Sequence, residues 1–160
     1  MTTVRRVIRE KAFQALFQLS THENLTNEEA IQLSLDSTLP INEERSLEAA
    51  MALVLPEKSK SKEIVDDSLT YLKKLVEGVQ TNREVIDETI NQHLKKWTLN
   101  RLERTNLLIL RLAAYELLFE KDEVDKRIVM NEAIELTKTY NDEKASKFVN
   151  GVLQSIADQQ

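Results

Sequence analysis

The sequence predicts an all-α protein, and three observations support this prediction. Apolar residues recur at helical spacing along nearly the whole chain, and no stretch alternates with period two for long enough to indicate a strand. The 160 residues include only two glycines and two prolines, fewer than the turns of a sandwich, a barrel or a Rossmann fold require. Hydrophobic residues make up 41% and charged residues 31%, a balance typical of a globular chain.

The N-terminal part predicts one regular helix followed by a less regular segment. The first helix is indicated by the apolar set Ile8, Ala12, Ala15, Leu16 and Leu19. Residues 20–62 contain both prolines and predict two short helices, in 28–37 and 43–55, before an exposed polar loop. Thr26 and Glu29 have the spacing of a capping box at the start of the first short helix.

The C-terminal part predicts further helices, for a total of about seven. Apolar residues at helical spacing occupy 64–79, 85–97, 107–119, 129–136 and 148–156. The 107–119 run has 11 apolar residues among its 13 positions, so we expect it to be the central helix that the others surround. Thr81 with Glu84 has the spacing of a second capping box, and Asn141 and Asp142 are candidate caps of the last helix.

Several function classes lack the residues they need. Cysteine is absent, which excludes disulfides, thiolate metal sites and a cysteine nucleophile. The two histidines, His22 and His93, are far apart, so no histidine-containing metal site is indicated. The two glycines, Gly78 and Gly151, are isolated, so there is no glycine-rich phosphate loop. We therefore expect no enzymatic activity, no cofactor and no metal.

No targeting or membrane-spanning segment is indicated either. The basic N-terminus is interrupted by charged residues before an apolar run develops. Residues 107–119 are too short to cross a bilayer, which takes about 20 residues, and they include Arg111 and Glu116. The expectation is a cytoplasmic protein without membrane contact.

The charge of the chain is segregated. Net charge is −5, but residues 1–19 carry four cationic side chains and one carboxylate, so this segment is +3 and the remainder −8. On a helical wheel Arg6, Arg9, Phe13 and Phe17 fall within an arc of about 80°. Guanidinium groups pair with phosphates and aromatic faces stack on unpaired bases, which predicts a single-stranded RNA site. The alternative is that Phe13 and Phe17 are core residues.

The last predicted helix carries a second, weaker basic cluster. Lys144 and Lys147 lie near its start, next to Phe148, where cations oppose the helix macrodipole. This unfavourable placement indicates a ligand or a partner. Gly151 lies in the middle of the same helix, where glycine is destabilising, and we interpret it as a point of close approach between two helices.

The pattern resembles the NusB family of bacterial transcription antitermination factors. The similar segments are RRVIREKAFQALFQ at 5–18, LVEGVQTN at 75–82, LLILRLAAYELL at 107–118, NEAIELTKTY at 131–140 and KFVNGVL at 147–153. These five blocks follow the family order and span most of the chain, and the last two are the most specific. Residues 20–62 match no block.

The resemblance implies both a fold and a function. The fold would be a single RNA-binding domain over 1–160, a NusB-like bundle in which an N-terminal helical lobe (1–62) packs on a C-terminal helix bundle (63–160). The family binds the boxA element of ribosomal RNA leader transcripts together with NusE, a small-subunit ribosomal protein. With other Nus factors the pair associates with RNA polymerase and supports transcription past terminators, and no catalysis is involved.

The resemblance also implies which residues contact RNA. The expected contacts are Arg5, Arg6, Arg9, Phe17, Lys144, Lys147 and Phe148. Phe17 stands where many family members have tyrosine, so the stacking face is kept and the hydroxyl is lost. Lys144 occupies a position that is acidic in some relatives and would add a contact of its own. Three further residues, Phe13, Thr81 and Asn82, are either RNA-facing or structural.

Two other functions stay open at this point. One is a non-catalytic helical protein-interaction module, a homodimer that buries the face of Phe13 and Phe17 and does not bind RNA directly. The other is an accessory domain of an RNA-modifying enzyme, although we do not expect the 160 residues to include a catalytic domain as well. The RNA-binding interpretation itself is compatible with either a monomer or a homodimer.

Overall fold

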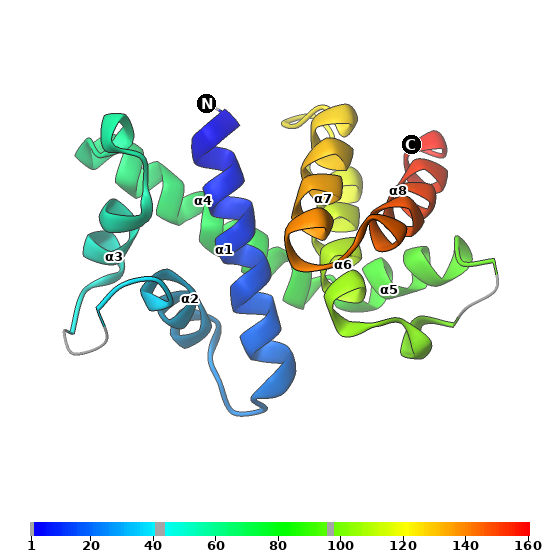
Figure 1. Ribbon diagram of the computed structural model, residues 1–160, viewed down its shortest axis with the longest axis horizontal. Helices are drawn as coiled ribbons and strands as arrows, with labels where there is room; N and C mark the ends of the chain where they lie inside the picture. Colours follow the sequence, from blue (N-terminus) through cyan, green and yellow to red (C-terminus); the bar gives the residue numbers. More distant parts are fainter. Residues whose placement is uncertain (1, 41–43, 96–97) are drawn as a thin grey trace. The chain divides into compact units, whose positions relative to one another are not determined.

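The computed structural model describes residues 2–40, 44–95 and 98–160, and every regular element within them is helical. The α-helices are α1 (Thr2–Thr21), α2 (Asn27–Asp36), α3 (Leu47–Val54), α4 (Lys62–Thr81), α5 (Arg83–Gln92), α6 (Arg104–Phe119), α7 (Lys126–Tyr140) and α8 (Glu143–Asp158) (Figure 1). Single-turn 3-10 helices cover Glu57–Ser59 and Leu99–Arg101. The all-α prediction is confirmed. None of the described helices is long and apolar enough to cross a membrane.

The chain forms two compact units, residues 1–77 and 78–160. In the first unit, α1 packs on α2, and α2 packs on α3. The largest fully buried side chains of this unit are Ile8, Leu16, Ile31, Leu35, Met51, Leu72 and Leu75. They come from α1 to α4, so each of these four helices buries an apolar face.

The helix α6 is the centre of the second unit. It packs against α5, α7 and α8, and Ile109, Leu110 and Ala114 are at most 1% exposed, as the apolar run predicts. Arg111 is a charged residue in this run, and it pairs with Asp87 of α5. The Asp87 carboxylate accepts hydrogen bonds from the Arg111 Nε at 2.8 Å and Nη2 at 3.0 Å. These two hydrogen bonds give Arg111, the one cation in the apolar run, an ion-pair partner.

The irregular N-terminal segment differs in detail from its prediction. The helix α2 agrees with the predicted range 28–37 to within one residue at each end, whereas α3 begins at Leu47. Residue 43, the predicted start of that helix, lies outside the described residues, as does Trp97 of the predicted 85–97 helix. The expected exposed loop before α4 contains the Glu57–Ser59 turn, whose Ser59 is buried.

Two of the predicted helix caps are present. In the capping box before α2, the Glu29 backbone N–H donates to Thr26 Oγ1 and the Thr26 backbone N–H donates to Glu29 Oε1, both at 3.0 Å. Asp142 caps α8, because its carboxylate accepts from the Ala145 backbone N–H at 2.8 Å. All three bonds satisfy backbone N–H groups that have no intrahelical partner at the start of a helix.

The capping box predicted for Thr81 and Glu84 is wrong. Thr81 is still the last residue of α4, and the single residue Asn82 separates it from α5. The Asn82 side-chain amide donates to the Gly78 carbonyl at 2.8 Å, so it closes α4, and no side chain caps the start of α5. The two helices follow each other too closely for Thr81 to adopt the extended backbone that a cap needs.

Gly78 is required by the close approach of Tyr115. A Cβ atom at Gly78 would overlap the Tyr115 ring. Tyr115 is 5% exposed, stacks on Phe119 with ring centroids 5.5 Å apart, and donates from its hydroxyl to Glu120 Oε1 at 3.3 Å. These contacts hold the ring in place, so it has no free space into which it can move away from a larger residue.

We expect Gly78→Ala to destabilise the protein although alanine is the better helix former. Overpacking typically costs about 1–3 kcal/mol, which exceeds the gain of about 1 kcal/mol in helix propensity. The measurement is urea unfolding followed by circular dichroism. The matched control is Gly151→Ala in α8, where a Cβ atom meets nothing within 4 Å and the propensity gain should appear alone. Equal stabilisation by both substitutions would contradict the packing role of Gly78.

Candidate nucleic-acid interface

The predicted arginine–aromatic stripe of α1 is only partly at the surface. Arg5 and Arg6 are exposed, and the Phe17 ring is 36% exposed. Arg9 is only 6% exposed and interacts with other residues of the protein, and Phe13 is only 2% exposed. The core interpretation therefore holds for Phe13 but not for Phe17. The stripe reaches the surface at its two ends and is covered in its middle.

Phe13 supports the exposed ring of Phe17. The two ring centroids are 6.3 Å apart with an interplanar angle of 59°, a tilted arrangement that is favourable for aromatic pairs. Because Phe13 is fixed in the core, its ring restricts the movement of Phe17. An exposed aromatic ring that is held in this way offers one of its faces for stacking against a flat ligand.

Arg5 is positioned by Tyr71, a residue that the sequence analysis did not single out. The Arg5 guanidinium carbon lies 3.6 Å from the centroid of the Tyr71 ring, and Tyr71 belongs to α4. At this distance the ring quadrupole attracts the cation and limits its rotation. Tyr71 is distant in sequence from α1, and helical spacing alone carries no signal that would pair these two residues.

Lys11, which contributes to the basic charge of the N-terminal segment, has a structural role. Its Nζ donates to the Ser34 carbonyl at 3.0 Å, Gln14 Oε1 at 3.2 Å and Ser37 Oγ at 3.4 Å. Ser34 lies in the last turn of α2, where carbonyl groups lack intrahelical partners and attract cations. Burial lowers the pKa of Lys11, partly offset by Glu10. This ammonium group caps α2 from inside and takes no part in the exposed surface.

The second predicted cluster lies on the first turns of α8, in the unit formed by residues 78–160. Lys144 and Lys147 are exposed and Phe148 is half-buried. Phe148 borders two hollows. One, of about 370 Å³, also involves Lys144 and Asp142. The other, of about 360 Å³, is lined by His93, Leu94, Lys95, Lys147, Phe148, Gly151, Val152 and Ser155.

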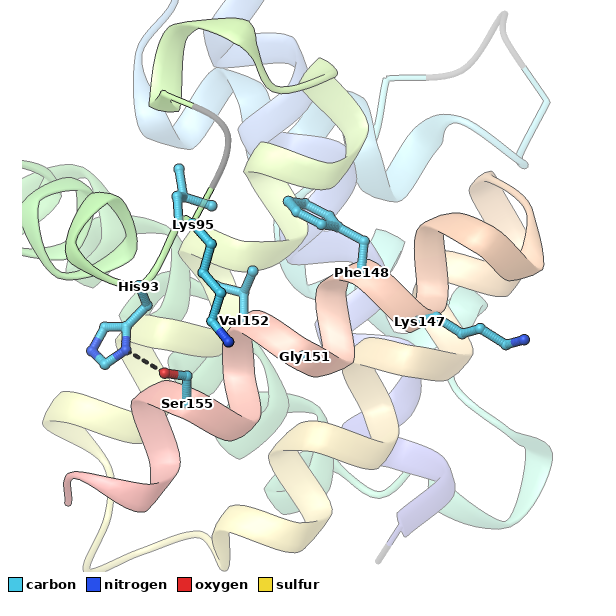
Figure 2. A pocket seen from close by; sticks show the side chains of 8 residues that line it. His93, Lys95, Lys147, Phe148, Gly151, Val152 and Ser155 are labelled. Carbon is cyan, nitrogen blue, oxygen red and sulfur yellow. Dashed lines mark hydrogen bonds between the residues drawn. The ribbon is translucent and has the colours of Figure 1, made fainter.

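We call this second cavity the α8 hollow, and Figure 2 shows it from close by. His93, Lys95, Val152 and Ser155 lie on one side of Gly151, and Phe148 and Lys147 lie on the other. His93 Nδ1 and Ser155 Oγ are 2.7 Å apart and form a hydrogen bond that joins α8 to the residue following α5. No sequence pattern singles out His93 or Lys95 for this place, because only the fold brings them to α8.

The interpretation of Gly151 as a point of close helix–helix approach is wrong. Gly151 is exposed, and a Cβ atom placed on it would meet nothing within 4 Å. Its position on α8 faces the hollow instead of a neighbouring helix. The two glycines of the chain, both inside helices, therefore differ: Gly78 is covered by a tyrosine ring, and Gly151 is open.

Among the residues with two interpretations, the half-buried Asn82 donates from its side-chain amide to the Gly78 carbonyl at 2.8 Å. Thr81 is exposed and Phe13 is a core residue. Within the described residues, no group of three or more histidine or carboxylate side chains could hold a metal ion.

The chain is similar to NusB proteins over almost its whole length. The model of the NusB family matches residues 6–158. Over 154 residues the chain is 39% identical to the transcription antitermination protein NusB of Listeria monocytogenes serotype 4a, covering 96% of this chain and 95% of that protein. Over 150 residues it is 40% identical to the protein of the same name from Clostridium botulinum strain Loch Maree, covering 93% and 96%.

Solved structures give the same result. A NusB chain in a crystal structure of the antitermination factors NusB and NusE in complex with dsRNA superposes with a TM-score of 0.75 at 28% identity, and the match covers 100% of both chains. A NusB structure from T. maritima superposes with a TM-score of 0.71 at 33% identity, covering 98% of this chain and 92% of that one.

Proposed function

The chain belongs to the NusB family, and from this premise we propose that it is a transcription antitermination factor that binds RNA together with a NusE partner. The observation that carries the proposal is the likeness over the full chain to a NusB protein crystallised with NusE and dsRNA. The more specific part of the proposal is that the RNA is single-stranded and carries boxA from a ribosomal RNA leader. Such a factor works in the cytoplasm, with other Nus factors and RNA polymerase as indirect partners.

We assign the RNA contacts to residues that are accessible in both units. Arg5, Arg6 and Phe17 supply two guanidinium groups and a ring on α1, and Lys144, Lys147 and Phe148 supply two ammonium groups and a ring on α8. Guanidinium and ammonium groups bind phosphates, and the rings stack on unpaired bases. We leave Arg9 out of this set, because its burial keeps the guanidinium away from an incoming phosphate. Both units would then act as one RNA-binding domain.

The expected affinity of the chain alone is modest. About three to five phosphate contacts give a salt slope of about −2 to −4, at roughly −0.7 per contact for single strands. A partner protein would therefore be needed for tight binding. The net charge outside residues 1–19 is −8, which favours association with a basic ribosomal protein because complementary fields increase the association rate.

The homodimeric interaction module is the less favoured alternative. It required an accessible face formed by Phe13 and Phe17 together. Phe13 is 2% exposed within its own unit, so only Phe17 is left to form that interface. A single half-exposed ring is far smaller than the surface that a stable dimer buries.

We expect Arg6→Glu to reduce RNA binding by at least about tenfold, because hydrogen bonds to charged groups contribute about 1.5–3 kcal/mol. The measurement is fluorescence anisotropy with a short boxA RNA and a scrambled RNA, with and without NusE, over a salt series. Lys121→Glu, at an exposed residue after α6, makes the same change in charge outside the proposed contacts and serves as the control. Wild-type protein that binds both RNAs equally at every salt concentration, even with NusE, would refute the proposed function.

Tyr71 gives a second, more selective test. Tyr71→Phe keeps the ring face below Arg5, so its RNA affinity should stay close to that of the wild type. Tyr71→Leu removes the ring and should weaken RNA binding by about two- to fivefold, in line with about 0.5–1 kcal/mol for an accessible cation–π contact. Melting temperatures measured in parallel identify a general loss of stability. If both variants lose the same affinity, Tyr71 does not act through its ring face on Arg5.

A further inference from the structure

Nothing in the described part of the chain requires a glycine at position 151. It lies in the middle of α8, where glycine weakens a helix relative to alanine. None of the described glycines has a positive φ, so the backbone does not require glycine here. A Cβ atom would meet nothing within 4 Å, so packing does not require it either. What glycine does provide at this point is an exposed stretch of helix backbone that a ligand can approach closely.

The surroundings of Gly151 favour an anion with a flat apolar part. The described residues that line the α8 hollow include the cations Lys95 and Lys147 and no carboxylate. Neither ammonium group has an ion-pair or hydrogen-bond partner among the described residues. Leu94, Phe148 and Val152 provide apolar surface in the same hollow. Uncompensated cations beside a half-buried aromatic ring are unusual on a chain whose net charge is −5.

Two other hollows in the same unit differ in charge. One contains Glu103 and Asp142 together with Arg101 and Lys144. The other contains Asp87 and Glu88, and its Arg111 is already paired with Asp87. Both combine charges of opposite sign, as expected for ordinary solvated surface. The α8 hollow is the one of these three in which cations are left unbalanced.

We propose that a single-stranded RNA passes over Gly151, with one base against the Phe148 ring and the adjacent phosphates on Lys95 and Lys147. The absence of a side chain at Gly151 lets the sugar and the base edge reach the backbone of α8. The proposal rests on the proposed RNA-binding function and adds Gly151 and Lys95 to its contacts. Lys147 and Lys95 flank Gly151 along the length of α8, so the strand would follow α8 past this residue (Figure 2).

The chemistry of the hollow favours RNA over a protein partner. A basic protein surface would be repelled by two unpaired ammonium groups, whereas each RNA phosphate supplies the opposite charge. The aromatic ring and the cations are the two components that recur in single-strand binding sites, where bases stack and the backbone follows a positive groove.

Gly151→Ala and Gly151→Leu test the proposal without loss of folding. Both replace glycine by a better helix former, so melting temperatures should rise by about 2–4 °C. RNA affinity should fall in the order of side-chain size, severalfold for alanine and at least about tenfold for leucine, because the strand loses its room over α8. Gln154→Ala, at an exposed position on the same helix, is the control and should leave RNA affinity unchanged.

Lys95→Gln provides an independent test of the proposal. It should weaken binding of the boxA RNA and reduce the magnitude of the salt slope by about 0.7, the value for one phosphate contact on a single strand. Binding of NusE in the absence of RNA, measured by calorimetry, should be the same for wild type, Gly151→Leu and Lys95→Gln.

The outcomes separate this proposal from the proposed function. If wild-type protein binds the boxA RNA and Arg6→Glu disrupts binding while Gly151→Leu does not, the passage of the strand over Gly151 is wrong and the function stands. If Gly151→Leu impairs NusE binding but not RNA binding, the hollow is a protein docking site and the proposal is equally wrong. If the wild type itself shows no selective RNA binding, the proposed function fails first.

Discussion

A helix that is apolar on nearly every side is stable in water only when other helices cover all of those sides, and α6 is such a helix. Its contacts with α5, α7 and α8 meet this requirement and determine where those helices lie. The position of α8 fixes the exposed face that carries Lys147 and Phe148. The candidate RNA surface of this unit is thus a consequence of burying one hydrophobic segment.

The same constraint explains the polar groups that the second unit tolerates. Arg111 is accepted beside the core because Asp87 supplies two hydrogen bonds in a fixed geometry. The Tyr115 hydroxyl is buried because Glu120 accepts from it, and its ring fits because residue 78 is glycine. Each exception to apolar packing has a specific partner. No buried side-chain polar atom is left without a hydrogen bond among the described residues.

The helices were largely predictable from sequence because apolar spacing reports directly on which face of a helix is buried. The exposure of individual residues on a helix was not predictable in this way. On the wheel of α1, Arg9 and Phe13 lie at one side of the arc and are covered, whereas Arg6 and Phe17 lie at its other side and are exposed. The width of a buried face depends on the packing partner, which local spacing does not encode. For the same reason the role of Tyr71 beside α1 could not be predicted.

Two local predictions, the capping box at Thr81 and the close helix approach at Gly151, were wrong for a different physical reason. A capping box is defined by spacing alone, so the Thr81 pattern was indistinguishable from the real one at Thr26 until the short α4–α5 junction was known. A glycine in a helix indicates only that a side chain is absent. Whether that space is filled by a neighbour, as at Gly78, or left open, as at Gly151, is a property of the fold.

The burial of Lys11 has a consequence for chemical labelling of the protein. An amine-reactive reagent modifies the lysines whose amino groups it can reach, and Lys11 is 5% exposed and donates three hydrogen bonds from its Nζ. Amine labelling of the folded protein would therefore miss Lys11, although this lysine contributes to the positive charge of residues 1–19. Acylation at Lys11 would report local opening between α1 and α2. The rate of acylation at this one amine would measure how often that opening occurs.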